Sequence, residues 1–247
     1  EISKLARKQL EASGIEILTS AKIKSFAKGE NNVTGIIEKM NNQQKEITID
    51  RVILAIGVKG NTDNLGLEET RVLINNNQIV TNLFGQTNEP SIFALGDVIT
   101  GPELTPIALA QGMHFARKQF ANLETKLEYG FIPTAVFSQP PIGTVGFTEE
   151  EAEKEFGEFS IYKSSFRPMK NTISGRNQET FIKLIVENKS DRVVGIHMVG
   201  PDAGEIIQGM AIALNAGATK SVFDKTIGIH PTTAEEFVTM RTVWSES

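Results

Sequence analysis

Residues 180–217 restrict the possible folds of this chain more than any other segment. Two runs, "TFIKLIVE" and "RVVGIHMVG", are rich in apolar and β-branched residues and have the length of strands. The next run, "AGEIIQGMAIALNAG", is helical in pattern and apolar on most sides, which predicts burial nearly all round. With "TAVFS" as a further strand and "TEEE" as a capping box that starts a helix, residues 127–247 are predicted to interleave strands and helices.

The first 57 residues show a different pattern. Residues 2–13 place apolar side chains near one side of a helix. Alternating apolar and polar residues follow, with Asn-Asn turns at 31–32 and 41–42, which predicts a β-meander. Residues 52–56 are continuously apolar, which predicts a strand that is covered on both faces.

The middle of the chain is rich in loops. The runs "QIVT" and "SIFAL" are predicted to be short strands. A helix is predicted from Thr105, with Thr105 as its N-cap and Pro106 at the first helical position. The free N–H groups at this end could face a partly negative ligand atom, as at any helix start.

The composition excludes several classes of function. With 247 residues, 40% of them hydrophobic, the chain can bury a core and form one to three domains. It has no run of about 18 apolar residues and no secretory signal, so a cytoplasmic location without a membrane partner is expected. A net charge of −5 with scattered basic residues argues against nucleic acid as a partner. The absence of cysteine excludes thiol chemistry within these residues, and the three histidines lack metal-ligand spacing.

The segment "GIHPTTAEEFVTMR" holds the first candidate for chemistry. One interpretation is a helix start, in which Thr233 and Glu236, or Thr232 and Glu235, form a capping box. The other interpretation gives the segment a catalytic role, in which Glu235 orients one ring nitrogen of His230 and leaves the other free for proton transfer. The spacing alone leaves both interpretations open.

Asp97 is the second candidate, because it follows an apolar run and a glycine in "TNEPSIFALGDV". A carboxylate just past the end of a strand can accept hydrogen bonds from ligand hydroxyls, or it can close a local turn. The phosphate-binding patterns G-x-G-x-x-G and G-x-x-x-x-G-K-[ST] do not occur in the sequence. The basic residues of "FRPMKNTISGR" fit a solvated turn.

These segments together resemble one family. "GIHPTTAEEFVTMR" resembles the C-terminal signature of the glutathione-disulfide reductase branch of the pyridine-nucleotide flavoprotein disulfide reductases, and "TNEPSIFALGD" fits the flavin signature of that family. "AVFSQPPIGTVGFTEEEA", "FRPMKNTISGR" and "GPDAGEIIQGMAIALNAGATKSVFD" are similar to the interface domain of the same branch. The resemblance runs from the first helix to the C-terminal residues.

The resemblance implies a fold of α/β and α+β type, seen from the second half of a subunit. Residues 1–57 would complete an NADPH-binding domain, and residues 58–126 would complete an FAD-binding domain. Residues 127–247 would form an α+β interface domain with an antiparallel sheet. NADPH would reduce FAD, and FAD would reduce a cysteine pair that lies upstream and opens glutathione disulfide. The chain alone would therefore be inactive, and the enzyme would be a homodimer whose subunits share each active site.

The resemblance also implies roles for single residues. His230 would protonate the departing glutathione thiolate as general acid, and Glu235 would hold its tautomer and charge. Asp97 would bind the ribityl hydroxyls of FAD, and the helix start at Leu104 and Thr105 would point at the flavin ring. The expected contacts of glutathione are Met169, Glu236 and Thr239.

Two other functions are compatible with the sequence. "AIGVKGNTDNLGLE" resembles the dihydrolipoamide dehydrogenase branch more than the glutathione branch. A non-catalytic dimerisation module of the same fold would explain the missing cysteines and phosphate loops, although it would not require a paired His230 and Glu235.

Overall fold

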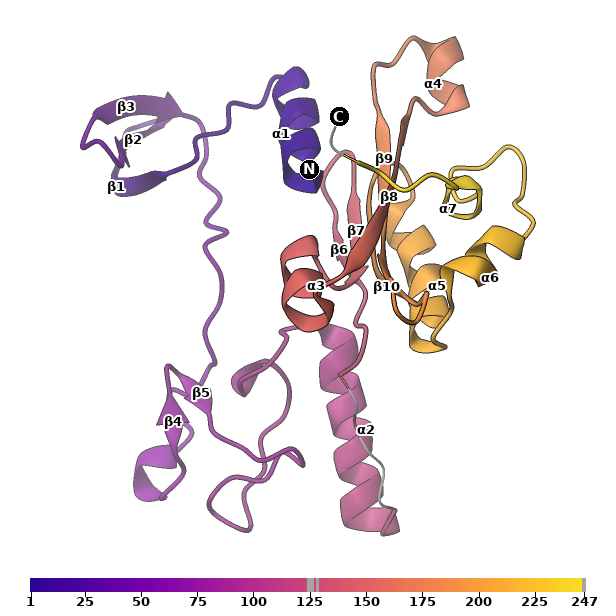
Figure 1. Cartoon of the computed structure of the whole chain (residues 1–247). Helices are drawn as coiled ribbons and strands as arrows, with labels where there is room; N and C mark the ends of the chain where they lie inside the picture. The colour runs from indigo at the N-terminus through magenta and orange to yellow at the C-terminus, as the bar shows by residue number, and fades with distance from the viewer. Residues whose placement is uncertain (124–126, 128, 246–247) are drawn as a thin grey trace. The chain divides into compact units, whose positions relative to one another are not determined.

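The computed structural model describes residues 1–123, 127 and 129–245. The chain divides into two compact units, which are described separately (Figure 1). The first unit contains Glu1–Thr19 and Tyr129–Ser247, and the second contains Ser20–Glu128. The domain boundaries predicted at residues 57 and 126 concern a family architecture that this division does not test, and residue 126 lies outside the described residues.

A five-stranded antiparallel sheet organises the first unit. Its strand order is β6-β7-β10-β9-β8, so the two most apolar strands lie in its interior, where neighbours cover both edges. The strands predicted from "TAVFS", "TFIKLIVE" and "RVVGIHMVG" are confirmed, as is the α+β class with an antiparallel sheet. The strands are β6 (Thr134–Val136), β7 (Ile142–Gly146), β8 (Phe159–Phe166), β9 (Thr180–Glu187) and β10 (Val193–Val199).

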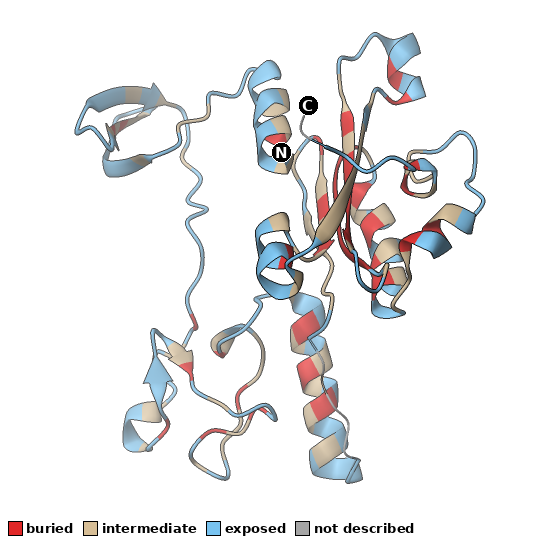
Figure 2. Ribbon diagram, in the orientation of Figure 1, coloured by how far each residue is buried: buried red, intermediate tan, exposed pale blue. Residues whose placement is uncertain are grey.

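The main core lies between this sheet and α5 (Ala203–Asn215). Figure 2 shows the buried residues concentrated on β9, β10 and the sheet-facing side of α5. Burying each large aliphatic side chain contributes about 1.5–3 kcal/mol. In this single chain α5 is not buried all round, because Ile212 is 69% exposed. The sheet covers only one side of the helix. The fully buried members of this core include Ile182, Leu184, Ile196, Met198, Ile207 and Leu214.

A close approach between α5 and β7 requires glycine. A Cβ atom on Gly143 would lie 2.6 Å from Cγ1 of Ile207 and 2.7 Å from the carbonyl oxygen of Ala203. Any side chain at this position would therefore push the helix away from the sheet.

The opposite face of the sheet carries α3 (Glu149–Phe156), which packs Ala152 against Ile185 and Val194. The capping box predicted from "TEEE" is confirmed. The Thr148 hydroxyl accepts a hydrogen bond from the Glu151 amide at 3.3 Å, and the Thr148 amide donates to the Glu151 carboxylate at 2.9 Å. The predicted first helix is also confirmed as α1 (Ile2–Ala12).

Three short helices complete the first unit and carry the candidate site. Helix α4 (Met169–Ser174) lies in the connection from β8 to β9. Helices α6 (Lys220–Lys225) and α7 (Glu236–Thr239) follow α5 and are joined by an exposed loop. Phe237 on α7 is fully buried in the main core, so it anchors the far end of that loop.

The second unit begins with the predicted meander, which is confirmed as an antiparallel sheet in the order β1-β2-β3. Its strands are β1 (Ala21–Lys28), β2 (Val33–Lys39) and β3 (Gln44–Ile49). The strand predicted at residues 52–56 is wrong for this chain, because the segment has no strand geometry. Ile53 and Ile56 are each 89% exposed. A strand that is covered on both faces needs neighbours, and no described strand pairs with this segment.

Residues 60–123 contain short elements and one longer helix, and a small cluster of apolar side chains lies among the short elements. These elements are η1 (Leu67–Glu69), β4 (Ile74–Asn75), β5 (Gln78–Ile79), η2 (Gly96–Val98) and α2 (Thr105–Ala121). The run "QIVT" contains β5 as predicted. The strand predicted from "SIFAL" is wrong, because Phe93 forms only an isolated bridge with Gln86.

The predicted helix from Thr105 is confirmed, but the predicted N-cap is wrong. Leu104 has extended backbone angles and is the N-cap, while Thr105 is already helical. Pro106 is therefore the second helical residue, a position whose N–H has no partner within the helix in any case.

Candidate active site

The loop between α6 and α7 carries His230 at the surface. Thr219 starts α6, because its hydroxyl accepts a hydrogen bond from the Val222 amide at 3.3 Å. At the other end of α6, the Thr226 hydroxyl donates to the Val222 carbonyl at 2.8 Å. The chain then leaves the helix and exposes residues 227–232 before α7 begins.

Glu235 holds one side of the His230 ring. Nδ1 of His230 lies 3.1 Å from each carboxylate oxygen of Glu235. A carboxylate only accepts hydrogen bonds, so Nδ1 carries the proton of this contact, and Nε2 is the nitrogen available to a substrate. The His230 side chain is 79% exposed, whereas that of Glu235 is 18% exposed. No described residue hydrogen-bonds Nε2.

The same carboxylate also closes a turn. The Thr232 amide donates to Oε1 of Glu235 at 3.3 Å, and the Glu235 amide donates to the Thr232 hydroxyl at 3.2 Å. These reciprocal bonds are those of a capping box, although α7 begins only at Glu236, three residues after the position that such a box implies. The alternative pair of Thr233 and Glu236 is wrong, because the Glu236 carboxylate instead accepts a hydrogen bond from Ser164 at 3.0 Å. Glu235 therefore fulfils both interpretations of the sequence, since it forms the capping-box bonds with Thr232 and also contacts the ring of His230.

A groove of about 440 Å³ lies beside His230. It contains charges of both signs, with Arg167 and Lys170 as cations and Glu235 and Glu236 as anions. Arg167 hydrogen-bonds the carbonyls of Arg176 at 3.0 Å and Asn171 at 2.9 Å. It therefore also holds the loop around α4. The lining residues are Phe166, Arg167, Pro168, Met169, Lys170, His230, Pro231, Thr232, Thr233, Glu235 and Glu236.

Two of the three residues expected to contact glutathione line this groove. Met169 and Glu236 are part of its surface. Thr239 is not among the lining residues, and its hydroxyl donates to the Glu236 carbonyl at 3.4 Å. The structure thus brings together His230, Glu235, Met169 and Glu236 from two segments far apart in sequence.

The residues expected to contact the flavin belong to the second unit. Asp97 is exposed in η2, next to a glycine whose amide donates to Oε1 of Gln111 at 2.6 Å. Gln111 is a buried residue of α2, so this bond attaches η2 to that helix. Leu104 is partly buried and Thr105 is exposed at the helix start. Gln111 was not identified from the sequence as the residue that holds η2. The available signal was a polar residue within an otherwise apolar stretch of the predicted helix.

Neither a metal cluster nor a membrane span is found among the described residues. In the ranges 1–123 and 129–245, no group of three or more His, Cys, Asp or Glu side chains is placed to hold a metal ion. Every helix in the part of the chain that the structure describes lacks the length and hydrophobicity that a transmembrane segment requires.

Comparison with known proteins gives two family matches, which together cover most of the chain. Residues 1–112 match the family described as pyridine nucleotide-disulphide oxidoreductase, and residues 132–241 match the dimerisation domain of that family. The second match contains His230, Glu235 and the whole groove.

Three curated relatives are named glutathione reductases. The chloroplastic/mitochondrial protein of Pisum sativum is 46% identical over 209 residues, which are 84% of this chain and 38% of that relative. The protein of Nostoc sp. is 44% identical over 211 residues, which are 80% of this chain and 46% of the relative. The protein of Burkholderia cepacia is 46% identical over 194 residues, which are 78% of this chain and 43% of that relative. The chain thus spans less than half the length of these relatives. The two family matches and the three relatives agree, and the chain belongs to the pyridine nucleotide-disulphide oxidoreductase family.

Proposed function

We propose that this chain is part of an FAD-dependent oxidoreductase that uses NADPH to reduce glutathione disulfide. The relatives named glutathione reductase support the substrate. The contact between His230 and Glu235 is the single observation that carries the chemical role. The redox cysteine pair would be supplied from outside this cysteine-free sequence. The cytoplasmic location expected from the sequence stays a prediction.

His230 acts as the general acid in this proposal. A cysteine thiolate attacks one sulfur of glutathione disulfide, forms a mixed disulfide and expels a glutathione thiolate. His230 in its imidazolium form gives the proton on Nε2 to that thiolate and becomes neutral. Glu235 keeps Nδ1 protonated throughout and stabilises the charged ring through its carboxylate. The exposure of the ring leaves Nε2 accessible to the departing sulfur.

The groove beside His230 is the proposed substrate site. Glutathione carries both carboxylates and an ammonium group, and the groove offers both signs of charge. Lys170 can receive a carboxylate, Glu236 can receive the ammonium group, and Met169 provides an exposed apolar contact. The expected contact of Thr239 stays a prediction.

The proposed flavin site uses Asp97, Leu104 and Thr105. Asp97 presents an exposed carboxylate, whose oxygens can accept hydrogen bonds from the hydroxyls of a ribityl chain. The start of α2 has free backbone N–H groups that favour partial negative charge, as the reduced flavin ring would carry. FAD when bound would pass electrons from NADPH to the cysteine pair. The residues present therefore fit the cofactor.

The active form in this proposal is a homodimer in which the His230 and Glu235 of one subunit complete the site of the other. The match to a dimerisation domain supports the dimer. The exposed side of α5, which includes Ile212, offers apolar surface that a second copy would cover.

The test compares the two half-reactions in the flavin-loaded protein, using His230→Ala. We expect re-oxidation by glutathione disulfide to slow by about 10²–10⁴-fold. Flavin reduction by NADPH should stay near the wild-type rate, because His230 takes no part in it. Lys225→Ala, at an exposed position outside the groove, is the matched control and should leave both rates unchanged. Equal loss of both half-reactions in His230→Ala would refute the role of general acid.

The same preparation separates the alternative functions. A preference for dihydrolipoamide and NAD over glutathione disulfide and NADPH would assign the protein to the dihydrolipoamide dehydrogenase branch. A protein that retains no flavin and turns over neither substrate pair would instead be a dimerisation module.

A further inference from the structure

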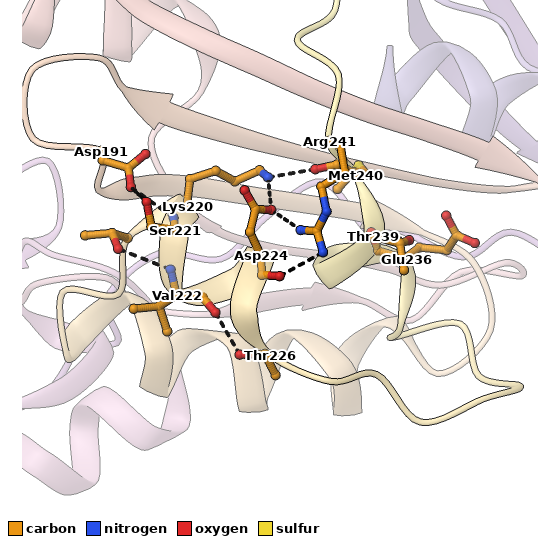
Figure 3. A network of polar contacts seen from close by, with 11 residues as sticks. Asp191, Lys220, Ser221, Val222, Asp224, Thr226, Glu236, Thr239, Met240 and Arg241 are labelled. Atoms are coloured by element: carbon orange, nitrogen blue, oxygen red, sulfur yellow. Dashed lines mark hydrogen bonds and ion pairs between the residues drawn. The ribbon is translucent and has the colours of Figure 1, made fainter.

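Lys220 is a buried cation for which the proposed chemistry has no use. It is the first residue of α6 and is only 3% exposed. Its Nζ atom donates to the Asp224 carboxylate and, at 2.7 Å, to the carbonyl oxygen of Met240 (Figure 3). It also lies 4.3 Å from the centre of the Tyr162 ring. A buried ammonium group is retained only where such partners offset its loss of hydration.

Arg241 completes this arrangement from the residue after Met240. Its Nη1 atom donates to the Asp224 carboxylate, and its Nη2 atom donates to the Asp224 carbonyl at 2.7 Å. Burial acts to raise the pKa of Asp224, but hydrogen bonds and charges from Lys220 and Arg241 outweigh it and hold that pKa below its usual range. We call Lys220, Asp224, Arg241 and the Met240 carbonyl the Lys220 cluster.

The Lys220 cluster joins the two ends of the loop that carries His230. Lys220 and Asp224 belong to α6, which precedes the loop, and Met240 and Arg241 follow α7. Figure 3 shows the contacts running from α6 to Met240 and Arg241, in the segment after α7. Between these ends, no backbone N–H of residues 227–235 donates to another backbone carbonyl among the described residues. The loop is therefore held by the Lys220 cluster at its two ends, by its own side chains, and by the hydrogen bonds that the carbonyls of residues 233–235 accept from the amides of α7.

Gly228 packs closely against Glu235, so the position of Glu235 depends on how the two ends of the loop are held. A Cβ atom on Gly228 would lie 2.8 Å from Cβ of Glu235 and 3.3 Å from Cγ2 of Val238. The segment entering the loop from α6 thus packs directly against the segment that enters α7. If the two ends separate, the segment that contains Gly228 moves away from Glu235, and the ring of His230, two residues further on, moves with it.

We propose that Lys220, Asp224 and Arg241 are positioning residues for His230 and Glu235. They hold the ends of the loop together, so that the Glu235 carboxylate stays against Nδ1 before substrate arrives. None of them lines the groove, and none would touch the substrate. This inference rests on the proposed function, because it assigns these residues to the protonation step. An error of about 1 Å in the placement of a catalytic group can cost about a hundredfold in rate.

The test uses the flavin-loaded enzyme with Lys220→Met, which keeps an apolar stem of similar length and removes the donor. We expect kcat for glutathione disulfide reduction to fall about tenfold, with KM changed less than about twofold and flavin reduction by NADPH unchanged. Arg241→Gln is the second variant, because Arg241 is half exposed and its loss is less able to unfold the chain. It should lower kcat about threefold, and Arg241→Lys should restore most of that loss.

Ser221→Ala is the matched structural control. Ser221 is on the same helix, but its hydroxyl donates to Asp191 at 2.6 Å, away from the loop. This variant should lower the thermal stability without changing kcat. If Lys220→Met lowered the melting temperature and left kcat intact in the folded enzyme, the cluster would be only structural and the inference would be wrong.

A double variant separates this inference from the proposed function. In a His230→Ala background, Lys220→Met should have less than about a twofold further effect on single-turnover disulfide reduction, because the residue it positions is gone. A full tenfold further loss would overturn the inference. If His230→Ala itself left disulfide reduction intact, the proposed function would fail whatever Lys220→Met does. If His230→Ala slowed the reaction and Lys220→Met did not, only the positioning role would fail.

Discussion

The carboxylate of Glu235 contacts Nδ1 of His230 at 3.1 Å through both of its oxygens. It also accepts the amide of Thr232 at 3.3 Å, so one side chain closes the turn and orients the ring. These two roles share one geometry, because the turn places the carboxylate where the ring of His230 lies. A substitution at Glu235 can therefore affect both the turn and the orientation of the ring.

Glu235→Gln is expected to slow disulfide reduction about tenfold. The amide can still accept from the Thr232 N–H, so the turn persists, but it offers no negative charge to a protonated ring. Stopped-flow measurement of flavin re-oxidation by glutathione disulfide checks this. Glu153→Gln removes an exposed carboxylate from α3 and should leave the rate unchanged. An unaltered rate in Glu235→Gln would show that the contact has no catalytic role.

Gly228→Ala is expected to lower activity by displacing Glu235. The new methyl group would lie 2.8 Å from Cβ of Glu235, which is attached to the backbone and cannot rotate away. Overpacking of this kind costs about 1–3 kcal/mol, which thermal unfolding measures. Gly209→Ala is the control, because no atom lies within 4 Å of that position and alanine favours the helix. Full activity in Gly228→Ala would show that the loop tolerates a wider separation.

Asp97→Ala is expected to weaken flavin retention without a large loss of stability, because the side chain is exposed. The flavin absorbance that remains after gel filtration measures retention. Glu103→Ala, which removes another exposed acid in the same unit, should leave the flavin content unchanged. Wild-type flavin content in Asp97→Ala would remove Asp97 from the cofactor site.

Gln111→Leu should instead lower the stability of the protein by about 1–3 kcal/mol, because the amide of Gly96 loses its acceptor.

His197 is expected to make stability depend on pH. Its Nε2 donates to the Phe147 carbonyl at 2.9 Å, and Nδ1 accepts from the Thr144 hydroxyl at 2.5 Å. Burial lowers the pKa of His197 below 6.5, and the bond to Phe147 only partly opposes this. The unfolded chain therefore binds a proton more readily than the folded one. Stability should be full above pH 6.5 and should be lost as the pH falls from there towards the folded pKa.

The measurement is the melting temperature from about pH 8 to about pH 5, in wild type and in His197→Gln. The glutamine amide can still donate to the Phe147 carbonyl but cannot be protonated in this range, so the slope should flatten. Thr144→Ser retains the hydroxyl and should retain the slope. An equal slope in His197→Gln would assign the pH dependence to other groups.

Much of the first unit could be predicted because its signals are local. The apolar runs of β9 and β10 and the reciprocal bonds of Thr148 and Glu151 depend on residues within a few positions of one another. Residues 52–56 have an equally clear strand pattern, yet they are exposed and unpaired. A strand pattern in the sequence indicates that a segment can form a strand, but the strand forms only where neighbouring strands are present to pair with it.

The sequence by itself determined the family and the strands β6, β9 and β10 of the five-stranded sheet, and it placed His230 and Glu235 within six consecutive residues. The hydrogen bond between their side chains was seen only in the structure. Only the tertiary structure decided that Met169 and Glu236 share a groove, that Gly228 packs against Glu235, and that Lys220 reaches the carbonyl of Met240. These contacts join segments whose separation in the chain says nothing about their distance in space. They form because burying Phe237 and the core side chains brings α6 and α7 together.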